Sequence, residues 1–134
     1  MSCYEPINTL DAKPLQALGP RQRFFVNSLK SGHFGQAKHR LKEDNGTFCA
    51  LGVAAECAGV LWARGKNCFG DLCWGLNDED GNFRSAILPE SVDNFYSFVS
   101  SGRDIHALND AGNTFERIAE MIESNPAKFF SSPK

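Results

Sequence analysis

Residues 47–59 read TFCALGVAAECAG, and this stretch decides the fold. Apart from Thr47 and Glu56, its members are apolar or small, so a helix over these residues has no face suited to contact with water. The alanines and glycines let neighbouring elements pack close to it. The stretch therefore predicts a helix from Thr47 or Phe48 to about Gly59, at the centre of a small domain.

Three further helices are predicted around this central one. Pro20 opens the first, which ends at residues 31–32, a Ser-Gly pair. The second follows Pro89 and carries apolar side chains at i, i+3, i+4 and i+7 until residues 100–102 close it. The third begins with Asn113 as its cap and with a glutamate three positions later, and an Asn-Pro pair stops it. The helices account for most of the expected core.

A turn-forming run, NDEDGN at residues 77–82, separates residues 74–76 from residues 83–88 and predicts a short β-hairpin. We therefore expect a mainly α fold, a small α+β domain of about four helices around a central apolar helix. With 134 residues the chain has the length of one domain. We assign residues 19–125 to it, residues 1–18 to an N-terminal arm and residues 126–134 to a C-terminal tail that docks back or stays loose.

The charge balance and the cysteines limit the classes of function. Fourteen basic and 16 acidic residues give a net charge of −2, which argues against a general nucleic-acid binder. No apolar stretch approaches the length of a membrane span, so we expect no membrane partner. The five cysteines follow no leading apolar segment, which predicts reduced thiols and a cytoplasmic location.

Cys49 is the candidate nucleophile, because the start of a helix favours a thiolate. A cysteine hydrolase also needs a base and a group that orients it. His106 with Asn109 and Asp110 is one source of both, and His39 is another. In the alternative interpretation, Cys49 is a small buried apolar residue.

Polar residues beside the apolar stretches indicate a ligand pocket between helices. The candidate ligand-binding residues are Gln36, Lys38, Arg40, Asn77, Asn109 and Asp110. Lysine and arginine suit an anion, and the amides suit a ribose or amide edge. In the alternative interpretation, Asn109 and Asp110 only form the turn into the last helix.

The sequence predicts neither a metal site nor a cofactor. The spacing of Cys68 and Cys73 differs from that of zinc ligands, and the acidic run at residues 77–82 misses the register of a calcium-binding loop. The common phosphate-loop, serine-hydrolase and metalloprotease motifs do not occur. Their absence favours a non-enzymatic role.

Four blocks resemble a family of small phage and bacterial proteins of uncharacterised function. They are SGHFGQAKHRL at residues 31–41, NGTFCALGVAAE at residues 45–56, LPESV at residues 88–92 and LNDAGNTFERIAEMIE at residues 108–123. The centre of that family reads Tyr-Cys-Cys-Leu-Gly-Val-Leu-Cys. In this chain Ala50 replaces the second cysteine, which speaks against a mechanism with two adjacent thiols. His106 is not part of the family pattern.

The resemblance implies a phage or phage-derived gene, whose product we expect in the host cytoplasm. By analogy with other phage accessory proteins, it implies binding rather than catalysis. We therefore expect an accessory binding protein that captures a small anionic or nucleotide-like ligand or a host protein. One alternative is a cysteine-dependent hydrolase or transferase that uses Cys49. Another is a structural or oligomer-forming domain, which a large apolar surface patch would indicate.

Overall fold

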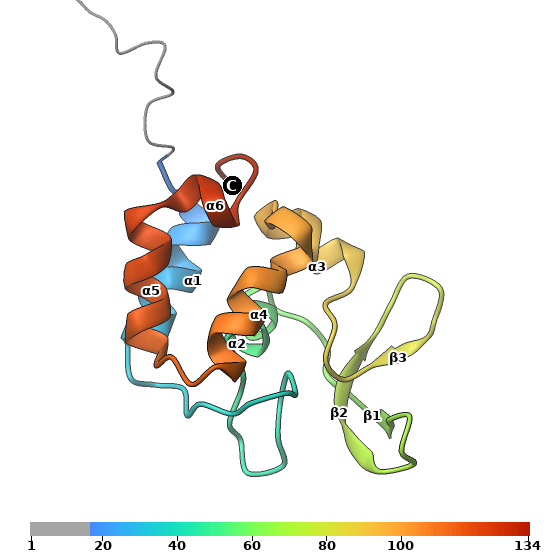
Figure 1. Cartoon of the computed structure of the whole chain (residues 1–134). Helices are drawn as coiled ribbons and strands as arrows, with labels where there is room; N and C mark the ends of the chain where they lie inside the picture. The colour runs from blue at the N-terminus through green and yellow to red at the C-terminus, as the bar shows by residue number, and fades with distance from the viewer. Residues whose placement is uncertain (1–16) are drawn as a thin grey trace, which may run out of the picture.

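The computed structural model describes residues 17–134, so most of the predicted arm at residues 1–18 lies outside the described residues. Helices and short strands make up a small α+β fold, as predicted (Figure 1). None of the helices in the described part of the chain is long and apolar enough to cross a membrane. The elements are α1 (Pro20–Lys30), α2 (Ala50–Cys57), β1 (Ala63–Lys66), β2 (Leu72–Asn77), β3 (Phe83–Arg84), α3 (Glu90–Tyr96), the 3-10 helix η1 (Val99–Gly102), α4 (Arg103–Asp110), α5 (Phe115–Ser124) and α6 (Pro126–Phe129).

Helix α2 is the buried central helix that the sequence predicts, although it starts later. Cys49 has an extended backbone and serves as the N-cap, so the helix begins at Ala50 rather than at Thr47 or Phe48. All residues from Ala50 to Ala55 are buried. A Cβ atom at Gly52 would lie 1.7 Å from the carbonyl oxygen of Leu41, which shows how closely the preceding loop crosses the helix.

Helices α1 and α5 lie side by side, and α1 also packs on α2 (Figure 1). The predicted apolar face of α1 is buried through Phe25, Val26 and Leu29. Phe25 joins an aromatic cluster with Tyr96 and Phe98 at centroid distances of 5.5 and 6.1 Å. This cluster connects α1 to the segment that follows α3.

The segment after α3 differs from the prediction. Helix α3 ends at Tyr96 because Ser97 adopts a left-handed backbone with φ of 57°, whereas the predicted helix continued to about residue 99. Residues 103–110, which the sequence analysis leaves without a helix, form α4. Helix α5 is capped by Thr114, whose hydroxyl accepts the Arg117 N–H at 3.1 Å, and not by Asn113.

The C-terminal segment docks on the helices. Phe129 and Phe130 are buried, and Phe130 stacks on Phe98 at a centroid distance of 5.4 Å. The buried Gln22 donates from Nε2 to the carbonyl oxygens of Tyr96 and Ser132, at 2.7 and 2.8 Å. Phe129 and Phe130 are therefore part of the core, and this segment docks back on the helices.

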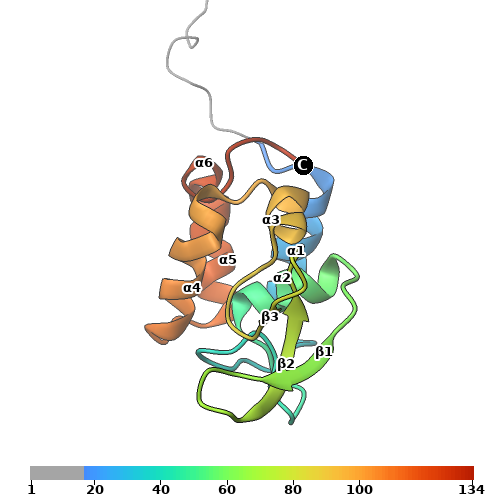
Figure 2. The ribbon, with the colours of Figure 1, turned by 90° about the vertical axis from the view of Figure 1, so that its right-hand side faces the viewer.

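The three strands form an antiparallel sheet in the order β1-β2-β3. Figures 1 and 2 place this sheet at the end of the molecule away from α6. Asn77 of β2 pairs with Phe83 of β3, as the predicted hairpin requires, but β3 covers only two of the predicted residues 83–88. The pairing of β1 with β2 was not predicted. The Phe83 ring lies against Gly65 and Gly75, where a Cβ atom would come within 2.7 Å of it.

Candidate functional site

Asp110, in the last turn of α4, holds two histidines. Its Oδ2 atom lies 3.0 Å from Nε2 of His106 and 3.2 Å from Nδ1 of His39. Its Oδ1 atom accepts the backbone N–H of His39 at 3.0 Å. His39 has a φ of 70°, so the carboxylate supports a strained backbone. The structure thus brings together His106, Asp110 and His39, three of the residues singled out in the sequence.

Asn109 is fully buried and serves the scaffold. Its Oδ1 atom accepts the N–H of Ala50, the first residue of α2, at 3.1 Å and the Nε2 group of Gln36 at 2.9 Å. Its Nδ2 group donates to the carbonyl oxygen of Ala37 at 2.7 Å. Gln36 also bonds to the backbones of Asn113 and Phe115. Both amides are satisfied within the protein, which leaves little capacity for a ligand.

Cys49 has a fully buried side chain. Burial raises the pKa of its thiol to about 11, and the nearby N–H groups of Gly52 and Leu51 offset this only in part. A rise from the usual value of 9.0 to about 11 makes the thiolate about 100-fold rarer at neutral pH. This environment favours the interpretation of Cys49 as a buried apolar residue at the start of α2.

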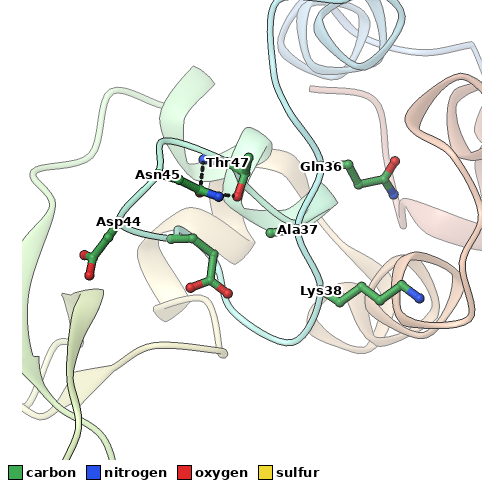
Figure 3. Close-up of a pocket in the computed structure, with 7 residues that line it drawn as sticks. Gln36, Ala37, Lys38, Asp44, Asn45 and Thr47 are labelled. Carbon is green, nitrogen blue, oxygen red and sulfur yellow. Dashed lines mark hydrogen bonds between the residues drawn. The ribbon is translucent and has the colours of Figure 1, made fainter.

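The loop before α2 borders a shallow polar depression of about 450 Å³. In Figure 3 the side chains of Gln36 and Lys38 extend to the side of the loop opposite Asp44. Glu43 and Asp44 line the same depression, so its charge does not suit an anion. Arg40 and the exposed Asn77 do not line this depression.

A second cavity, of about 490 Å³, lies between residues 86–88 and residues 100–106 and is less open to solvent. Apolar side chains line it together with two serines, one arginine and one histidine. The lining residues are Leu51, Ala86, Ile87, Leu88, Ser100, Ser101, Arg103 and His106. Apolar walls with a few convergent polar groups are typical of small-molecule sites.

The serines on this cavity have a strained backbone. Ser100 and Ser101 have φ values of 51° and 56°, and Gly102 continues the left-handed conformation at 79°. For residues other than glycine, this conformation costs roughly 1–2 kcal/mol each. Backbone strain concentrates at ligand-binding and catalytic sites. Here it places both serines on the wall of the cavity.

His106 connects the cavity to Asp110. Nε2 of His106 faces Oδ2 of Asp110 at 3.0 Å, and because a carboxylate only accepts hydrogen bonds, this contact suits a proton on Nε2. The other ring nitrogen, Nδ1, is buried and has no hydrogen-bond partner within residues 17–134. A buried polar atom without a partner is rare, so a ligand group is a natural complement to it.

Sequence reasoning missed Arg103, Ser100 and Ser101. The Ser-Ser-Gly run at residues 100–102 predicts only the end of a helix, and no prediction includes Arg103. The signal available in the sequence was Arg103, a basic residue directly after Gly102. A serine in the sequence does not indicate a left-handed backbone, whereas a glycine does.

Two carboxylates of the acidic run at residues 77–82 accept hydrogen bonds from neighbouring segments of the protein. The hydrogen bond from the N–H of Asn82 is the largest cause of the lowered pKa of Asp78, and Arg84 and the N–H of Asp80 also lower it. Glu79 accepts the N–H groups of Glu90 and Ser91, at 3.1 and 2.9 Å, and so caps α3. Within residues 17–134 no three histidine, cysteine or acidic side chains are arranged to hold a metal ion.

The relationship of the chain to known proteins was tested at three levels. Comparisons with protein-family models, with curated proteins and with solved structures find no match.

Proposed function

We propose that this protein is a binding protein that captures a small anionic ligand in the cavity between residues 86–88 and residues 100–106. The observation that carries the proposal is that Arg103 and His106 line one cavity together with four apolar residues and two serines. The guanidinium presents a planar fork of N–H donors that matches a carboxylate or phosphate. The apolar wall suits a ligand that also has a hydrocarbon or aromatic part.

Asp110 supports this role as a positioning residue. Its Oδ2 atom lies 3.0 Å from Nε2 of His106 and so fixes the orientation of the ring. In the protonated ring Nδ1 becomes a second donor toward an anion. The neutral ring instead offers Nδ1 as an acceptor for a ligand hydroxyl.

The buried Cys49 supports binding over cysteine chemistry. A nucleophilic thiol has to reach its substrate as a thiolate, and this one is enclosed and has a raised pKa. The polar depression near Lys38 contains two carboxylates, so the cavity beside Arg103 is the better anion site. A defined cavity favours the small-ligand form of the prediction over capture of a host protein.

Nuclear magnetic resonance titration of the full chain tests the proposal. The probes are inorganic phosphate, adenosine monophosphate, benzoate and octanoate. We expect at least one probe to shift the amide signals of residues 100–106 in a saturable way. Arg103→Gln should weaken that probe by roughly tenfold or more, because a hydrogen bond to a charged group contributes about 1.5–3 kcal/mol.

The matched control is Arg117→Gln, which removes an exposed arginine of α5 that pairs only with Glu120 at 3.5 Å. This variant should bind the probe as the unaltered protein does. The proposal is overturned if none of the four probes shifts residues 100–106, or if both arginine variants lose affinity equally.

A further inference from the structure

Away from that cavity, the ammonium group of Lys42 lies over three aromatic rings. Its Nζ atom is 4.6 Å from the ring centroid of Trp74, 5.3 Å from that of Trp62 and 5.7 Å from that of Phe48. All three distances fall within the range of cation–π attraction. Among residues 17–134 this ammonium takes part in no ion pair. Aromatic rings therefore replace the usual carboxylate partner.

Three separate segments hold these rings in place. Phe48 faces Lys42 across an antiparallel bridge, Trp62 directly precedes β1, and Trp74 lies in β2. The Trp62 indole donates from Nε1 to Oε1 of Glu56 at 2.7 Å, which fixes the ring. We call Phe48, Trp62 and Trp74 the aromatic cage. The hydrogen bond and the backbone pairing position it largely without the Lys42 side chain.

We propose that the aromatic cage is a binding site for a methylated organic ammonium ion, and that Lys42 is the resident cation which this ligand displaces. Aromatic cages bind quaternary ammonium groups and methylated lysine by cation–π attraction. A primary ammonium is strongly hydrated, so a methylated one gives up its water at lower cost. Glu56, at the rim of the cage, adds a negative charge.

The Lys42 side chain is suited to leave the cage. It is only half-buried, and its ammonium ends a flexible chain of four carbons. A competing ligand therefore removes the cation–π contacts of Lys42 without breaking an ion pair. In the protein without ligand, Lys42 therefore covers the rings, and a methylated ammonium ion that binds the rings more tightly displaces it.

Intrinsic fluorescence tests the proposal directly, because the two tryptophans of the chain are both members of the cage. The full chain is titrated with tetramethylammonium chloride, and sodium chloride at equal ionic strength serves as the reference. We expect a saturable change with tetramethylammonium alone. Lys42→Ala should bind it roughly tenfold more tightly, because the Lys42 ammonium no longer competes for the three rings, whereas Arg64 still lies over Trp74 at 4.9 Å. Lys66→Ala, which removes an exposed lysine of β1, should bind as the unaltered protein does.

The indole N–H resonances of Trp62 and Trp74 provide a second readout on the same variants. A peptide with trimethyllysine and the same peptide with unmodified lysine distinguish a protein ligand from a free ammonium ion. Preference for the trimethylated peptide supports a methylated protein partner, and binding of tetramethylammonium alone supports a small ammonium ligand. The proposal is overturned if folded Lys42→Ala shows no saturable change in either readout, or if sodium chloride produces the same change.

Discussion

Replacing Asn109 by leucine removes three hydrogen bonds from the interior while keeping the side-chain volume nearly constant. The N–H of Ala50 and the carbonyl of Ala37 lose their side-chain partner, whereas Gln36 keeps its bond to Asn113. Each buried group left without a partner costs about 1–3 kcal/mol. We therefore expect the free energy of unfolding to fall by about 4 kcal/mol, with a drop in Tm of roughly 15 °C for a domain of this size.

Urea denaturation and calorimetry measure both quantities. Asn77→Leu is the matched control, because Asn77 is exposed at the end of β2, and its unfolding free energy should change by less than about 0.5 kcal/mol. A loss below about 1 kcal/mol for Asn109→Leu would refute the view that this amide fastens α2 to the loop before it. An equal loss in the Asn77 control would refute it as well.

Three other changes test the scaffold. Gly52→Ala should lower the free energy of unfolding, measured in urea, by about 3 kcal/mol or more, because the new Cβ would lie 1.7 Å from the carbonyl oxygen of Leu41. An unchanged free energy of unfolding would contradict the close approach of this loop to α2. Gln22→Leu should increase hydrogen exchange over residues 126–134 at least tenfold, because three side-chain bonds to the backbone are lost, one of them to Ser132. Unchanged exchange would show that other contacts hold this segment. The pKa of the Cys49 thiol is raised in the folded state from 9.0 to about 11. The thiol therefore contributes stability that is complete below pH 9 and is lost as the pH rises from 9 to 11, by about 3 kcal/mol in total. In urea denaturation at increasing pH, Cys49→Ala should lack this part of the loss of stability, and equal pH dependence in the two proteins would contradict the reasoning. Alkylation of the unaltered protein, mapped by mass spectrometry, should modify the exposed Cys68 at least 100-fold faster than Cys49.

Local signals in the sequence were sufficient to predict the elements whose ends are marked by residues such as proline and glycine. Helix α1 lies between Pro20 and a Ser-Gly pair, and its predicted apolar face is the buried one. The central helix was predicted from composition alone, because a run without a polar face has to be buried. Its start was placed too early, since an extended Cys49 ends the loop one residue before the helix.

Helix α4 shows why the remainder was not predictable. It has eight residues, and only Ile105 and Asn109 are buried. Its last turn is held by Asn109 and Asp110 bonding to residues 36–39, some 70 positions earlier in the chain. Long-range polar contacts of this kind leave no periodic pattern in the sequence. The same two residues were therefore assigned to a pocket or a turn.

The candidate sites were predicted in part for the same reason. His106 and Asp110 were singled out because their side chains carry chemistry, and the structure places them together. Arg103 and the two strained serines face the cavity only because three successive residues turn left-handed. The aromatic cage joins three segments, and no local spacing relates them.

The contact between Gln22 and Ser132 also bears on how the chain folds during synthesis. These residues lie 110 positions apart, so the ribosome releases Ser132 well after Gln22. Until then the aromatic cluster around Phe25 lacks Phe130 and exposes apolar rings. Since domains fold as units and long-range contacts form slowly, the native packing of α1 has to wait for residues 130–132. The nascent chain is thus a candidate for chaperone binding while it is being made.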